Sequence, residues 1–238
     1  INGSLSYTKT GRGGSHTFRI GGEYMSERLD APVVGYGHSC NCISTLNNGV
    51  PIQVQILLGG NVSRNGLVTS AGFVDDTWRV TRRATLSLGI RLDRYQPGLP
   101  EQQGPAGQIF TAIDPVLTFN NWGPRAGMSA DLTGDGKTLL KLHYGPFWLY
   151  PGPIFTAAFN PYASGWSQTY RWTNDTNANG HWDAGEEGAL SALSGGSTST
   201  RLDTGIVNTH VHQATAYVER EVAGARAVPR ARRERERG

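Results

Sequence analysis

One loop of the sequence carries oxygen-bearing side chains at the spacing of a calcium-binding loop. It covers residues 175–186, with oxygen ligands at alternate positions, glycine at the sixth position and glutamate at the twelfth. Calcium takes about six to eight hard oxygen ligands around a tight turn that glycine permits. The predicted ligands of a structural Ca²⁺ are Asp175, Asn177, Asn179, the main-chain carbonyl of His181, Asp183 and Glu186.

The same loop has a simpler interpretation. Asp and Asn side chains accept hydrogen bonds from their own backbone in turns, and an Asx-rich turn would show the same composition. Residues 168–172, which precede the loop, are predicted to be extended, so no helix flanks it. We therefore expect an isolated loop of the weakly binding, extracellular kind and not a sensor pair that opens on binding.

Two further groups could bind a metal, and each has an alternative. His210 and His212 share one face of a strand but lack a third ligand nearby, which also fits ordinary surface or lumen histidines. Cys40 and Cys42 are separated by one residue and are too few for a zinc site. The second pair is open between a structurally minor pair, a strained disulfide and a metal contact.

Nothing in the sequence predicts an enzyme. Asp75 and Asp76 are adjacent and point to opposite faces of a predicted strand, so they do not form an acid/base pair. We find no nucleophile elbow, phosphate-binding loop or dinucleotide fingerprint.

The composition is typical of a chain with many strands and turns. The 238 residues include 32 glycines, and only 17% are charged, which argues against a helical bundle or a disordered chain. The net charge of +3 arises from the end of the chain, because residues 226–238 hold six of the 22 basic residues and two of the 19 acidic ones. The remainder carries one excess negative charge, so we predict no nucleic-acid binding, and a solvated, disordered tail at 223–238.

The alternation of side chains predicts long antiparallel strands. Residues 122–148 form two alternating runs around an Asp-Gly turn at 133–137, which is a strong hairpin signal. The clearest alternation lies in 85–95, where Arg91 and Asp93 are on the face opposite the leucines. The apolar face of that segment contains Leu86, Leu88, Ile90 and Leu92.

The connections alternate between tight turns and long loops. The turns lie at 10–14, 81–83 and 133–137, and the loops at 26–51, 96–121 and 150–210. Transmembrane barrels segregate short turns and long loops in this way, and a strand of about 9 to 11 residues spans the hydrocarbon. The predicted fold is all-β: a segment of an antiparallel up-and-down transmembrane β-barrel over residues 1–222, with a large external excursion at 150–210.

Three stretches resemble a known family. Ala71–Thr81 followed by Leu86–Tyr95 is similar to the F-x-Q-D-x-W and L-x-L-G-x-R-x-D strands of TonB-dependent outer-membrane receptors. Pro124–Gly127 with Asp131–Thr138 resembles the next hairpin of their Oar-like members, which carry a carboxypeptidase-regulatory-like domain. Gln213–Glu221 resembles the strand after their large loop. Asp75 stands where the family commonly has Gln.

The resemblance implies active uptake across the outer membrane of a Gram-negative bacterium. Its partners would be outer-membrane lipid, the TonB complex acting through a plug domain absent from this chain, and an unidentified small ligand or oligosaccharide. We expect no transport by this chain alone, because its roughly eight strands are an arc of a barrel of about 22.

A secreted β-sandwich is the alternative. In it, a second sheet instead of lipid would cover the Leu88 face, and calcium would hold the loop. Carbohydrate would bind through aromatic side chains, namely Trp166, Tyr170, Trp172 and Trp182.

Overall fold

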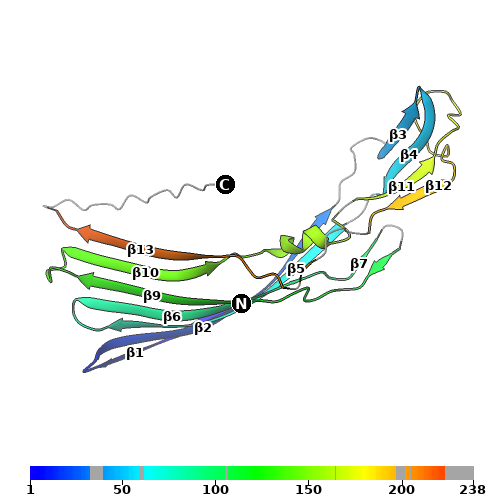
Figure 1. Ribbon diagram of the computed structural model, residues 1–238. Helices are drawn as coiled ribbons and strands as arrows, with labels where there is room; N and C mark the ends of the chain where they lie inside the picture. The colour runs from blue at the N-terminus through cyan, green and yellow to red at the C-terminus, as the bar shows by residue number, and fades with distance from the viewer. Residues whose placement is uncertain are drawn as a thin grey trace.

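A computed structural model describes residues 1–32, 40–58, 62–104, 107–163, 165–196, 202–203 and 205–222. Within these ranges the strands form antiparallel sheets of seven, four and two strands (Figure 1). The predicted tail at 223–238 lies outside the described residues. No helix in the described ranges is long and apolar enough to cross a membrane.

The seven-stranded sheet is the main body of the fold. Its neighbours follow one another in the order β1, β2, β5, β6, β9, β10 and β13. The strands are β1 (Asn2–Gly11), β2 (Gly14–Pro32), β5 (Val62–Arg79), β6 (Ala84–Gly98), β9 (Phe119–Asp131), β10 (Thr138–Trp148) and β13 (His210–Arg220). The sheet is curved and does not close on itself (Figure 1). The predicted all-β, up-and-down architecture with an incomplete barrel is therefore confirmed.

The tight turns gather at one end of this sheet, as predicted, and the long connections leave from the other end (Figure 1). The turn between β9 and β10 is closed by its own side chains, since Asp131 accepts hydrogen bonds from the backbone N–H groups of Gly134 and Gly136 at 2.8 and 2.9 Å. Both glycines have positive φ, 81° and 77°, a conformation that other residues rarely adopt.

The smaller sheets form an external part beyond the open end of the main sheet (Figure 1). The four-stranded sheet has the order β12, β11, β4, β3. Its strands are β3 (Cys42–Asn47), β4 (Val50–Leu58), β11 (Trp166–Arg171) and β12 (Leu190–Ser194), and the other elements are β7 (Gln102–Gln103), β8 (Ile109–Phe110) and the 3-10 helix η1 (Pro153–Phe159).

Parts of the segments that were predicted to be loops form strands, although their side chains show little alternation. Within 26–51, β2 continues to Pro32 and β3 begins at Cys42, and within 150–210 the segment Trp166–Arg171 pairs with β4. The loop prediction for the parts within 26–51 was wrong, because pairing partners distant in sequence stabilise short strands whose own pattern is weak. The extended conformation predicted for 168–172 is confirmed as far as Arg171.

A buried junction joins the external part to the main sheet. Leu67, Tyr95 and Phe119, from β5, β6 and β9, form an apolar cluster against which Leu117 and Phe155 pack. Beside it the amide of Asn160 donates to Asn65 Oδ1 at 3.1 Å, and the Thr156 hydroxyl donates to the same oxygen at 2.8 Å. Because buried polar groups with satisfied partners specify one arrangement, this junction fixes the external part on β5.

Candidate functional site

The two faces of the main sheet differ sharply in chemistry. The apolar face has a continuous cross-strand row of Tyr7, Phe18, Asp76, Leu88, Ala126, Tyr144 and Ala214, and adjacent rows add Leu86, Ile90, Leu92, Met128 and Leu142. The polar face has the intervening residues, including Arg19, Asp75, Arg91, Asp93, Arg125, Asp131 and Lys141. The predicted segregation of Arg91 and Asp93 from the leucines is confirmed.

Charges on the polar face form ion pairs across strands. Arg19 Nη2 lies 2.9 Å from Asp75 Oδ2, and Lys141 Nζ lies 2.9 Å from Glu219 Oε2. In the middle strands Arg91 contacts both Asp93 and Glu23, at 2.8 and 3.1 Å. These partners were not predicted, because the alternation assigns a side chain to a face and only the strand register says which side chains are neighbours.

The polar face also has a depression next to these pairs. It has a volume of about 440 Å³, and Thr17, Thr77 and Ser87 contribute hydroxyl groups to its lining. Its lining also includes Gly127 and Gly89, and the Asp75 carboxylate lies over Gly89.

The apolar face remains uncovered over the described residues. Leu88 is 51% exposed, and no second sheet packs on it, because the smaller sheets lie beyond the end of the main one (Figure 1). Trp166 and Trp172 are 2% and 0% exposed, so neither offers a ring to a sugar. The sandwich alternative required a covered Leu88 face and exposed aromatic rings; its other two aromatic residues, Tyr170 and Trp182, are partly buried.

A hydrogen-bonded pair of polar side chains lies on this apolar face. His16 Nδ1 is 2.8 Å from Asp76 Oδ2, and the imidazole stacks between Phe18 and Trp78 at centroid distances of 5.6 and 5.1 Å. His16 is two residues from the tight turn at Gly14, so the pair is near the edge of the apolar band. The predicted separation of Asp75 and Asp76 onto opposite faces is confirmed.

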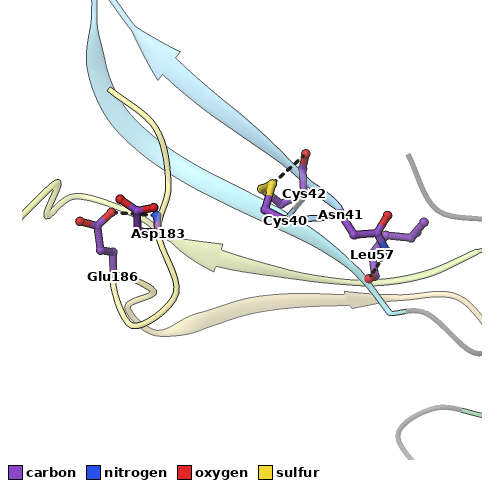
Figure 2. The surroundings of a disulfide bond; sticks show 6 residues. All are labelled: Cys40, Asn41, Cys42, Leu57, Asp183 and Glu186. Carbon is purple, nitrogen blue, oxygen red and sulfur yellow. Dashed lines mark hydrogen bonds between the residues drawn. A yellow bond between two sulfur atoms is a disulfide. The ribbon is translucent and has the colours of Figure 1, made fainter. Parts of the chain in front are cut away.

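The external sheet carries a disulfide that joins Cys40 to Cys42 (Figure 2). Among the alternatives for this pair, the structure therefore has the disulfide. The intervening Asn41 donates through its amide to Leu57 O and accepts from Leu57 N, both at 2.9 Å. Cys42 packs with Val54 and the fully buried Trp172, and Trp182 packs against this cluster. The disulfide thus lies beneath the loop that contains the predicted calcium ligands.

Four of the predicted calcium ligands are linked by hydrogen bonds within the loop. The side-chain amides of Asn177 and Asn179 donate to Asp183 Oδ2 at 2.8 and 2.9 Å. Asp175 accepts from the backbone N–H groups of Asn179 and Gly180 at 3.1 and 2.8 Å. Gly180 has φ 73°, the sharp turn that the pattern predicts.

The remaining two residues are placed differently. His181 contributes its backbone, and its N–H donates to Asn179 Oδ1 at 2.7 Å. Glu186, only 8% exposed, turns inward and accepts hydrogen bonds from the Thr176 hydroxyl at 2.6 Å and from the Trp172 indole at 3.2 Å. The Thr176 hydroxyl and further donors lower the pKa of the Glu186 carboxyl, against the effect of desolvation.

No cluster of three or more His, Cys, Asp or Glu side chains is arranged to hold a metal ion in the described part of the chain. His210 and His212 lie on the apolar face, with ring centroids 5.0 Å apart. The His212 imidazole bonds to Tyr144, with Nδ1 2.9 Å from the hydroxyl oxygen.

Comparison with known proteins gives two matches. The model of a family described as outer membrane beta barrel domain matches residues 1–228. A TonB-dependent transporter Oar from Myxococcus xanthus is 23% identical over 128 residues, covering 54% of this chain and 11% of the relative. The chain therefore spans about a tenth of the length of that relative. No solved structure matches.

Proposed function

The chain belongs to the outer membrane beta barrel domain family, and we propose that it forms part of the wall of a TonB-dependent transporter that takes up a ligand. Its place is the outer membrane of a Gram-negative bacterium. The apolar face contacts lipid and the polar face lines the lumen.

The segregation of the two faces is the observation that carries this proposal. The lumen side is lined by paired charges such as Arg19 with Asp75 and Arg91 with Glu23, whereas Leu88 and its neighbours lie opposite. A membrane wall needs this arrangement because lipid accepts no unpaired charge and water in the lumen solvates the polar side. The similarity to a TonB-dependent transporter supports energised uptake.

The external sheet would be on the outer surface, where a ligand first meets the protein. Its attachment to β5 through the buried Asn65 and Asn160 pair gives a rigid base for capture. The transported ligand would then move past a plug domain, which the TonB complex would rearrange. The ligand is an unidentified small molecule or oligosaccharide.

Calcium as a structural ion is the second part of the proposal. The spacing of residues 175–186 supports it, as does the convergence of Asn177 and Asn179 on Asp183. Asp175, Asn177, Asn179, the His181 carbonyl and Asp183 would hold the ion, which supplies positive charge between carboxylates and so tightens the loop. Glu186 would have to exchange its Thr176 and Trp172 partners to take part.

Cysteine labelling in cells tests the wall and its energised function together. Ser87→Cys places a thiol on the polar face and Leu88→Cys places one on the apolar face, one residue apart on β6. A membrane-impermeant maleimide should label the first and not the second, and labelling of Ser87→Cys should accelerate when TonB is active, because a moving plug uncovers the lumen. The native cysteines are paired and do not react.

The two results have separate meanings. Equal labelling at both positions would remove the membrane wall from the proposal. A difference between the positions with the same rates in cells with and without TonB would retain the wall and reject TonB-dependent uptake.

A further inference from the structure

The apolar face is hollowed at one place. Between β6, β9, β10 and β13 it has a groove of about 490 Å³, whose apolar lining includes Leu86, Leu88, Ala126, Leu142, Tyr144 and Ala216. Alanine contributes only a methyl group, so the alanines of β9 and β13 form the bottom of the groove and the larger leucine and tyrosine side chains form its sides. The groove opens on the side that family membership places against lipid.

Polar and aromatic side chains lie just beyond one end of this groove. On β13, His212 and His210 are two and four residues from Ala214 and therefore on the same face. Trp148 is paired with His210, their ring centroids are 4.4 Å apart, and the Trp148 indole donates to Trp122 O at 2.9 Å. Trp at this level is typical of the membrane–water interface.

The position of this cluster fits the outer leaflet. The strand β10 runs for 11 residues from the tight turn at 133–137 to Trp148, and about 9 to 11 tilted residues cross the hydrocarbon. Because short turns face the periplasm, Trp148 and His210 are at the external boundary. The groove below them is at the depth of acyl chains.

A cation lies on the same face, on a more distant strand. Arg94 is on β6 two residues beyond Leu92 and pairs with Asn120 of β9, so β9 and β10 separate it from His210 and His212 on β13. Within the described residues no carboxylate forms an ion pair with Arg94, and no hydrogen bond uses His212 Nε2. Positive charge and N–H donors at headgroup level complement a phosphate.

We propose that this groove is a specific site for one phosphate-bearing lipid of the outer leaflet. An acyl chain occupies the space between Leu88 and Ala216, and the headgroup phosphate contacts the imidazoles of His210 and His212. The site depends only on placement of the wall in the outer membrane, and it is independent of which ligand is transported or whether TonB drives the transport.

Native mass spectrometry of the full chain in detergent micelles tests the site. The micelles contain phosphatidylglycerol or diacylglycerol with the same acyl chains, so the two lipids differ in the phosphate-bearing headgroup. We expect a one-lipid adduct with phosphatidylglycerol in preference to diacylglycerol. Ala126→Phe fills the groove and should lower the adduct about tenfold, the equivalent of roughly two buried methylene groups.

The matched control is Ala130→Phe, the same change on the same strand and face but outside the groove. It should keep the adduct. Replacing His210 and His212 by Gln should retain lipid but remove the preference for phosphatidylglycerol. Circular dichroism checks that each variant is folded, and Ala216→Phe substitutes if Ala126→Phe does not fold.

Three results would overturn the proposal. They are equal adducts in Ala126→Phe and Ala130→Phe, equal binding of the two lipids by the unmodified chain, and a protein dimer in place of the lipid adduct. The last would identify the groove as a contact between two copies of the chain.

Discussion

Arg91 on β6 reaches across β5 to Glu23 on β2, with Nη2 3.1 Å from Oε2, while its Nε donates to Asp93 at 2.8 Å. The intervening position on β5 is Ala71, which is paired with both Glu23 and Asp93 and is small enough to leave the path open. One guanidinium thus connects three strands and separates two carboxylates.

The first prediction concerns this connection. Arg91→Met should destabilise the wall by about 1 to 2 kcal/mol, because Glu23 and Asp93 are left close together and unpaired. Solvent in the lumen screens the two carboxylates, so we expect the lower end of this range. Urea unfolding in micelles measures the change. Arg82→Met, in the exposed turn at 81–83, removes the same charge from a side chain that forms no ion pair with a described residue. It should change stability by less than about 0.5 kcal/mol.

The second prediction compares the two faces of one strand. Leu88→Arg should cost about 2 to 4 kcal/mol in a bilayer, since a cation near the middle of the lipid-facing wall must be desolvated. Ser87→Arg, one residue away on the polar face, should be close to neutral. Reversible unfolding from vesicles reports both values, and similar costs for the two variants would contradict the assignment of the faces.

Much of the main sheet could be predicted because its information is local. Leu86 to Leu92 alternate with Ser87 to Asp93, and the Asp-Gly turn at 133–137 fixes the register of β9 with β10, so faces and hairpins follow from the sequence. The Arg91 contact with Glu23 and the pairing of β4 with β11 could not be obtained this way, because they join residues whose proximity depends on the three-dimensional path of long connections. The disulfide is local, but the spacing of Cys40 and Cys42 left it open among three alternatives.

The loop at 175–186 illustrates the same division. The turn at Gly180 and the gathering of Asp175 with its neighbours were predictable from spacing. The inward orientation of Glu186 was not, because it depends on Trp172, which is buried by Cys42 and Val54 from a different part of the chain.

The third prediction follows from the lowered pKa of Glu186. A carboxyl whose folded pKa lies below its unfolded value adds stability above the unfolded pKa and loses it as the pH falls through the folded one. Hydrogen exchange at the Thr176 amide, which donates to Glu186 Oε1 at 2.9 Å, should therefore stay protected at neutral pH and lose protection in acid below the ordinary carboxyl range.

Glu186→Gln separates this effect from general acid unfolding. It should lower protection of the Thr176 amide at neutral pH by about tenfold and remove its pH dependence, because the neutral amide is a weaker acceptor. Glu187→Gln is the matched control, since Glu187 accepts only from the exposed Gly185 N–H among the described contacts. Loss of protection in both variants would contradict a specific role for Glu186.

The fourth prediction is that the 175–186 loop binds calcium. Terbium, which takes the place of calcium at oxygen sites, should show luminescence excited through Trp182 inside the loop, and calcium should displace it with an affinity of about 0.1 to 1 mM, as in extracellular modules. Asp183→Asn should weaken this binding about tenfold, because one of the charged ligands is lost. Asp203→Asn is the same change outside the loop and should leave binding unaltered.

If calcium binds, Glu186 must also leave the Trp172 indole, so the Trp172 Nε1–H signal in NMR should shift during the titration. Terbium luminescence that persists in Asp183→Asn, or a calcium titration that moves neither signal, would make the loop an Asx-rich turn held by its own hydrogen bonds.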